Sequence, residues 1–343
     1  MRKSSTNRGF PLKTREPLTS AEMGKLWATY MGNSMELCVL RYYLKHVDDE
    51  DIKNILQKSY DLSEEFSNRC AEILKADNHP VPFGFSDQDV NVEAPRLFGD
   101  EFYLHYLKYV AKAGLSIYGI AVPLVTRPDM REFFTHVLNS TVNLMTEING
   151  LLEAKSFLVR PPQIPVPTRP DYARKQSYLS GFIGPIRPLH ALEIAHLHDN
   201  LENNATSRTV LVGFSQVAQT QEARDYFLRG GEIAGKHYKI FSEILSKEHL
   251  PSPPILNHLV TESTISPFSD KLMIFHKLDM FSMRIRSYAN SMAVSPRHDL
   301  AATYGRLMLE VGKYAEDGAR IMIDAGGLEQ PPQAADREAL VSH

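Results

Sequence analysis

The segment EIAHLHDN contains Glu193 and, three residues later, His196. On a helix this Glu-x-x-His spacing places a carboxylate and an imidazole on one face, where both can bind the same metal ion. Two such pairs and two further carboxylates form the di-iron or di-manganese centres of ferritin-like bundles. The segment therefore raises the hypothesis of a metal site in the second half of the chain.

Other acids and imidazoles of this half follow helical patterns. His237 and His276 each lie on an apolar stripe, so both should face a core. Folding the expected hairpins brings Glu232, His276 and Asp317 to one level and His237 close to Glu310. Mixed imidazole and carboxylate ligation would favour Fe, Mn or Zn over Ca or Mg. The candidate metal ligands are His196, Glu232, His237, His276, Glu310 and Asp317.

The same side chains allow three interpretations. Buried imidazoles beside acids are costly unless they are bonded to one another. They could form a structural hydrogen-bond network, a functional polar pocket in the second half, or a solvent-facing set. Motifs of nucleotide-binding loops, nucleophile elbows and zinc ribbons are missing from the sequence, and no catalytic or cofactor-binding residue is identified.

The two halves of the chain are similar to each other. A shift of 171 residues aligns Glu22 with Glu193 and the segment 71–82 with 242–253, and a shift of 170 aligns the later part of each half. A near-constant offset over such a length indicates a duplication. No histidine follows Glu22 at the metal-binding spacing, so a carboxylate at a helix N-terminus is the favoured interpretation of Glu193.

The repeat also predicts the domain organisation. Prolines between the two units favour an extended connection that contains a short helix near 174–182. The tail is expected to be helical or frayed. The predicted segments are a disordered basic arm at 1–14, a first four-helix bundle at 15–160, a proline-rich linker at 161–187, a second four-helix bundle at 188–334 and a tail at 335–343.

Apolar residues recur at intervals of three and four throughout both units, which predicts an all-α fold. Short connections predict two helical hairpins in each unit. A longer, proline-rich segment between the second and third helices predicts a crossover that makes these helices parallel, as in ferritin-like bundles. A helical solenoid is the alternative. The helices of the second unit are expected at 189–217, 222–248, 268–294 and 297–325.

The composition excludes several classes of protein. Hydrophobic residues make up 43%, charged residues 23%, and the net charge is -3, which is typical of a soluble globular protein and not of one that coats nucleic acid. The longest apolar runs are too short to span a bilayer, and the N-terminus lacks the apolar core of a secretory signal. Cys38 and Cys70 fall in helical patterns, which predicts buried, reduced thiols suited to the cytoplasm.

Several segments carry a resemblance to a known family. They are LTSAEMGKLWATYMGNSM, FGFSDQDVN, APRLFGDEFYL, SPFSDKLMIFH and QPPQAADREAL. From about residue 15 to 340 the chain resembles an uncharacterised family of duplicated ferritin-like four-helix-bundle proteins from spore-forming Firmicutes, some of which are labelled spore-coat-like. The resemblance implies the fold and an association with sporulation, and it supplies no catalytic motif.

Together these features predict a non-catalytic structural or interaction protein of a spore-forming bacterium, whose second bundle binds a small ligand or an ion. The alternative is a metal-dependent oxidoreductase that uses the acids and histidines of that bundle. The expected partners are further copies of the chain, spore-coat proteins or a small ligand, and not nucleic acid. The expected location is the cytoplasm or the spore.

Overall fold

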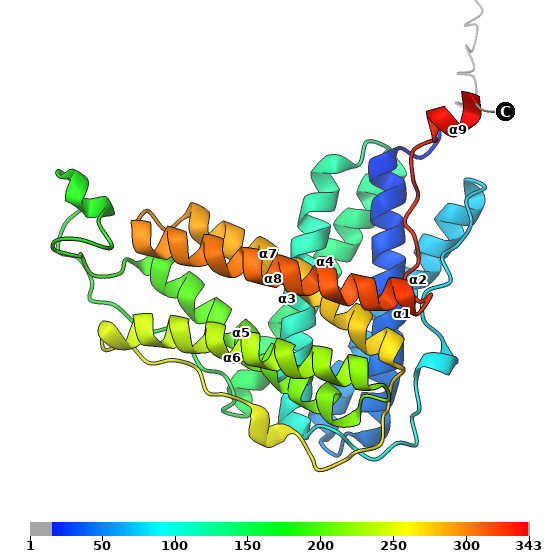
Figure 1. Ribbon diagram of the computed structural model, residues 1–343, viewed down its shortest axis with the longest axis horizontal. Helices are drawn as coiled ribbons and strands as arrows, with labels where there is room; N and C mark the ends of the chain where they lie inside the picture. The colour runs from blue at the N-terminus through cyan, green and yellow to red at the C-terminus, as the bar shows by residue number, and fades with distance from the viewer. Residues whose placement is uncertain (1–15, 342–343) are drawn as a thin grey trace, which may run out of the picture.

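The computed structural model describes residues 16–341, so the basic arm predicted at 1–14 lies outside the described residues. The described chain is helical, with eight long helices (Figure 1). They are α1 (Ser20–His46), α2 (Glu50–Ala76), α3 (Asp100–Leu124), α4 (Pro128–Ala154), α5 (Ala191–Val217), α6 (Gln221–Lys247), α7 (Asp270–Ala293) and α8 (His298–Asp324). Shorter elements are η1 (Asp87–Asp89), η2 (Gln176–Leu179), η3 (Asn257–Leu259) and α9 (Arg337–Val341).

Each unit consists of two antiparallel hairpins joined by a long crossover. In the first unit the segment 77–99 returns along the bundle, so α2 and α3 run in the same direction, and the segment 248–269 does the same in the second unit (Figure 1). The all-α class, the tandem bundles and the crossover are confirmed, and the helices of the second unit begin and end within two residues of the predicted positions. The finer description as ferritin-like stays a prediction.

Carboxylates fix the helix starts. In the first unit Glu22 accepts a hydrogen bond from the Thr19 amide at 2.8 Å and reaches the amides of Thr126 and Arg127 at 2.9 and 2.8 Å. It therefore ties the start of α1 to the start of α4. At the corresponding position Glu193 accepts from the His190 amide at 3.0 Å. Capping free backbone amides is a sufficient reason for both carboxylates.

The two units pack against each other around an approximate two-fold axis. The amide of Gly99 donates to the carbonyl of Leu259 at 2.9 Å, and the amide of Ser269 donates to that of Asp89 at 3.0 Å. These bonds are exchanged by the repeat offset of 170 residues. The same holds for Asn91 to Pro267 and Thr261 to Leu97. The crossovers thus pair with each other as equivalent segments of a dimer would.

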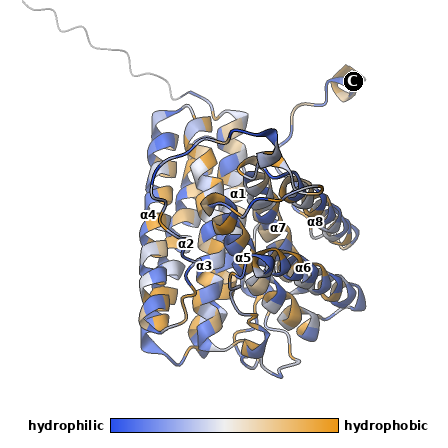
Figure 2. Ribbon diagram, turned by 90° about the vertical axis from the view of Figure 1, so that its left-hand side faces the viewer, coloured by the Kyte–Doolittle hydropathy of each residue, from blue (hydrophilic) through white to orange (hydrophobic). Residues whose placement is uncertain are grey.

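The helices of the first unit stand upright in Figure 1, and those of the second unit lie across them. One buried apolar cluster runs through both units, and Figure 2 shows the first unit from its side with the second packed against it. Cys38 and Cys70 are buried and free, as predicted, and burial raises the pKa of Cys38 to about 12. Among residues 16–341, the helices are too polar or too short to cross a membrane.

Candidate functional site

His237 and Glu310 are the predicted pair that the structure brings together. The two lie 3.1 Å apart, between Nε2 and Oε2, and the other ring nitrogen of His237 lies 3.0 Å from the hydroxyl of Tyr288. Burial lowers the pKa of His237 to about 4, so its ring is neutral near pH 7. Lys236 also binds Glu310, at 2.8 Å. These contacts satisfy the imidazole with protein partners.

His276 faces the first unit instead of the acids of its own bundle. Its Nε2 lies 3.0 Å from the hydroxyl of Tyr106, which in turn lies 2.9 and 3.1 Å from the carboxylate oxygens of Glu36. Burial lowers the pKa of His276 well below its ordinary value. The three groups form a chain of hydrogen bonds from α1 through α3 to α7.

The remaining predicted ligands are dispersed. Glu232 is exposed, Asp317 pairs with Arg229 at 2.9 Å, and His196 lies 3.3 Å from the hydroxyl of Ser291. Within residues 16–341, groups of three or more His, Cys, Asp or Glu side chains placed to hold a metal ion are absent. The assignment of Fe, Mn or Zn to this bundle stays a prediction.

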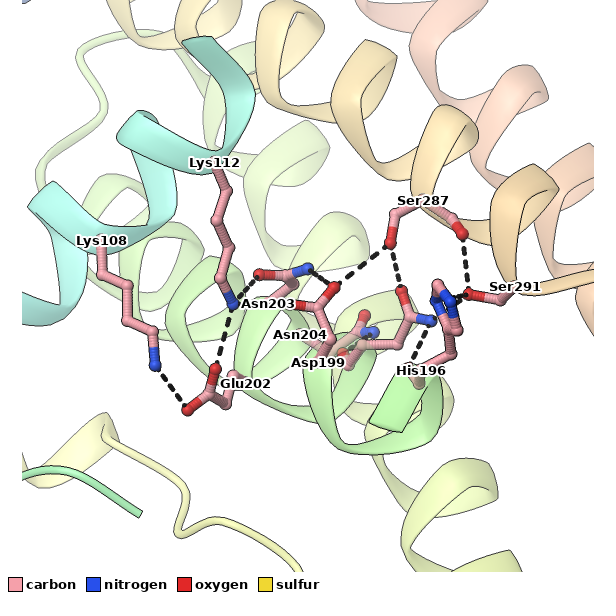
Figure 3. Close-up of polar contacts among 10 residues, drawn as sticks. Lys108, Lys112, His196, Asp199, Glu202, Asn203, Asn204, Ser287 and Ser291 are labelled. Carbon is pink, nitrogen blue, oxygen red and sulfur yellow. Dashed lines mark hydrogen bonds and ion pairs between the residues drawn. The ribbon is translucent and has the colours of Figure 1, made fainter. Parts of the chain in front are cut away.

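A polar network joins α3 of the first unit to α5 of the second (Figure 3). Lys112 donates to Asp199 at 2.7 Å and to Glu202 at 3.0 Å, and Lys108 donates to Glu202 at 2.9 Å. Burial alone would raise the pKa of Glu202, but the two ammonium groups lower it to about 2. Both charges are therefore present at neutral pH, and the network holds the two units together.

Helix α5 also forms hydrogen bonds with α7. Asn200 donates to the hydroxyl of Ser291 at 2.8 Å and accepts from that of Ser287 at 2.8 Å. One turn further on, Asn204 donates to Tyr288 at 2.9 Å. Of the three interpretations of the polar second unit, this geometry supports the structural hydrogen-bond network.

A cavity of about 90 Å³ lies in the core of the first unit. All four helices of that unit contribute to its wall, and α7 of the second unit closes one side. Its polar lining includes the side chains of Asn33, Glu36 and Asp279. Sequence analysis expected a polar pocket in the second unit, whereas this cavity is in the first.

The repeat explains why the cavity is confined to one copy. Gly114 and Leu144 line it, and their counterparts in the second unit are Arg284 and Tyr314. These larger side chains are only 1% and 2% exposed, and Tyr314 stacks on Tyr226 with ring centroids 4.3 Å apart. The second core is therefore filled where the first is open. Comparing side-chain size between aligned repeats is the sequence signal that would have located the cavity.

The pKa values of the two carboxyl groups that line the cavity are raised. Burial raises the pKa of Glu36 to about 8, against the opposing effect of the Tyr106 hydrogen bond, and the charge of Asp279 raises it further. Burial also raises the pKa of Asp279 to about 6, although Arg286 opposes the shift. Sequence reasoning missed Glu36, although an acid between the apolar residues Met35 and Leu37 was a visible signal.

The fold defines a duplicated all-helical protein whose two units pack into one body. The chain belongs to the family described as "Protein of unknown function (DUF3231)", whose model matches residues 8–169 and again residues 178–340. The two consecutive matches confirm the duplication. A comparison with curated proteins gives no match. Among solved structures, one described as a putative spore coat protein from Bacillus halodurans C-125 is 21% identical, with a TM-score of 0.40, over 44% of this chain and 98% of that chain.

Proposed function

We propose that this protein is a non-catalytic structural or interaction protein that binds a small ligand in the cavity of its first unit. The observation that carries the proposal is the cavity of about 90 Å³ itself, which lies between all four helices of the first unit and leaves space there for a small molecule. Its lining combines carbon walls with a few convergent polar groups, which is the usual composition of a ligand site.

The use of the interior polar groups supports a structural role. His237, His276 and Glu202 are all bonded to protein partners, and two of these contacts cross between the units. Side chains held in this way stabilise an interface and leave little to bind a reacting substrate. The two units together are thus suited to binding protein partners through their outer surfaces, and these partners are further copies of the chain or spore-coat proteins.

The ligand part of the proposal is tested by filling the cavity. Gly32 lines it, and a Cβ added there meets no atom within 4 Å, so the side chain of Gly32→Leu begins in open space at the cavity wall. Gly24 lies on the same helix with equally open surroundings but outside the cavity, which makes Gly24→Leu a matched control. Each variant gains about 1 kcal/mol of helix propensity.

The measurement is the melting-temperature shift produced by a panel of small neutral, cationic and anionic compounds. We expect at least one compound to stabilise the wild-type chain and Gly24→Leu but not Gly32→Leu. Equal responses of all three proteins to every compound would remove the ligand part of the proposal.

Location in the cytoplasm or the spore belongs to the same proposal and rests on the family resemblance. Fractionation of sporulating cells checks it, with the protein expected in the spore fraction. Recovery from vegetative cytosol alone would remove the association with spores and leave the ligand proposal standing.

The alternative of a metal-dependent oxidoreductase is favoured by one observation, the contact of 3.1 Å between His237 and Glu310. Elemental analysis of protein produced in metal-supplemented medium decides it. A full equivalent of Fe, Mn or Zn that is lost in His237→Ala would favour the oxidoreductase, whereas only traces of metal would exclude it.

A further inference from the structure

We infer that the cavity of the first unit takes a small primary ammonium ion, bound by Asn33, Glu36 and Asp279. This inference rests on the proposed ligand-binding role and names the chemical class of the ligand. The ion is recognised by three oxygen acceptors, by negative charge and by the size of the space.

The first acceptor is the side-chain oxygen of Asn33. Both hydrogens of its amide nitrogen are already donated, to the carbonyl of Thr29 at 2.7 Å and to the hydroxyl of Tyr118 at 3.1 Å. These bonds fix the orientation of the amide and leave Oδ1 as an acceptor at the cavity wall. Because this oxygen can only accept a hydrogen bond, it favours a ligand that has an N–H or O–H donor.

The second and third acceptors are carboxyl groups from different units. Glu36 comes from α1 and Asp279 from α7, and both line the cavity. Within residues 16–341 Glu36 accepts from Tyr106 alone, and Asp279 makes neither a hydrogen bond nor an ion pair. Their surroundings disfavour the charged form of both carboxyl groups, and Arg286 offsets this only in part for Asp279, so a positively charged ligand would stabilise their ionised forms.

The number of acceptors matches an ammonium group. An –NH₃⁺ group has three N–H donors, and each of the side chains of Asn33, Glu36 and Asp279 can accept one of them. The wall also includes the hydroxyl-bearing side chains of Ser59, Ser63 and Thr141, from α2 and α4, which suit a polar end of the ligand.

The remaining wall distinguishes an organic cation from a metal ion. Leu62, Phe66 and Met280 present carbon to the cavity. Sites for Ca²⁺ and Mg²⁺ gather about six or more oxygen ligands around one ion, and within residues 16–341 no group of three or more His, Cys, Asp or Glu side chains is placed to hold a metal ion. A cavity of about 150 Å³ holds benzene, so by proportion about 90 Å³ suits three to five non-hydrogen atoms.

The experiment is isothermal titration of the full chain with ethylammonium chloride. The matched solutions are potassium chloride at equal ionic strength and 1-propanol, which is a neutral molecule of similar size. We expect heat of binding with ethylammonium alone, and a loss of affinity of about tenfold or more in Glu36→Gln and in Asp279→Asn. The control variant is Glu72→Gln, whose carboxylate is on the surface and 66% exposed, and its affinity should equal that of the wild type.

Each other result overturns the inference in a recognisable way. Binding of 1-propanol that is unaffected by either carboxyl variant would keep the cavity as a ligand site and reject the ammonium ion. Binding of potassium with the same dependence on Glu36 and Asp279 would assign the site to a metal ion. No binding of any compound, together with no effect of Gly32→Leu in the panel above, would reject the proposed function as well. The melting temperature of each variant shows whether it is folded.

Discussion

The hydroxyl of Tyr106 and the Nε2 of His276 lie 3.0 Å apart, and the two residues occupy the same position in the two repeats. A residue that meets its own counterpart lies on the axis relating the units. Glu36 extends this contact into the first unit through its bonds to the same hydroxyl. The centre of the molecule is therefore a shared chain of three polar side chains.

Removing the central hydroxyl should destabilise the whole protein. Tyr106→Phe leaves the carboxyl group of Glu36 and the Nε2 of His276 without their shared partner, and an unsatisfied buried group costs about 1–3 kcal/mol. Urea unfolding should show that loss in a single transition. Tyr172 is 87% exposed, so Tyr172→Phe should leave the unfolding free energy unchanged. A Tyr106→Phe protein as stable as the wild type would show that the chain of hydrogen bonds contributes nothing.

The network around Glu202 should make stability depend on acid. Its folded pKa of about 2 is below the ordinary value of 4.5, so its contribution is complete above the unfolded pKa and is lost as the pH falls from there through about 2. The difference between these two pKa values corresponds to a contribution on the order of 3 kcal/mol to the free energy of unfolding. Glu202→Gln should remove this part of the acid dependence and also leave Lys112 without one of its carboxylates.

The check is the urea-unfolding free energy measured between about pH 7 and pH 3. Glu243 is 60% exposed, so Glu243→Gln should retain the wild-type acid dependence. Parallel curves for wild type and Glu202→Gln would contradict the assignment.

Glu36 should have the opposite effect on stability. Its folded pKa of about 8 is above the ordinary value of 4.5, so its proton is lost more readily from the unfolded chain. Stability is unaffected below the unfolded pKa, falls as the pH rises between the two values, and is constant above the folded one. Glutamine does not ionise, so Glu36→Gln should lack this fall.

The comparison is the difference in unfolding free energy between about pH 5 and pH 9 for wild type and Glu36→Gln. A smaller difference in the variant is expected. An equal difference would mean that Glu36 titrates as an ordinary surface carboxyl.

Glu193 should be needed for folding and not for binding a metal. It accepts from both terminal nitrogens of Arg187 at 2.8 Å and is fully buried. Glu193→Gln weakens a bidentate ion pair and should lower stability by about 1–3 kcal/mol. Metal content, measured by elemental analysis, should be unchanged. A variant that loses bound metal but keeps its stability would restore the ligand interpretation.

The architecture was accessible to sequence reasoning because it repeats. The sequence gives two versions of each helix, with equivalent positions such as Asn33 and Asn204, and the prolines of the crossovers indicate where the helices end. Local periodicity identifies the buried face of a helix, but it does not identify the neighbour against which that face packs. The contact between Tyr106 and His276 depends on how the two units dock, and no pattern within one unit encodes it.

The candidate site was less accessible for a physical reason. Sequence reasoning looked for reactive side chains and found His237 with Glu310, which are indeed neighbours. A cavity arises instead where side chains are small, and Gly32 and Gly114, which line this one, have no reactive group that would identify them as site residues. Asp279 comes from the other unit, so the site is complete only after docking.

The exchange of hydrogen bonds between the two crossovers has a consequence for how the halves can differ. In an ordinary homodimer, any substitution appears on both sides of the axis at once. Tethering the copies in one polypeptide removes that constraint, so the protein behaves as a heterodimer that assembles at a fixed one-to-one ratio. The first unit can then keep a cavity lined by carboxyl groups, while the second unit keeps a filled core.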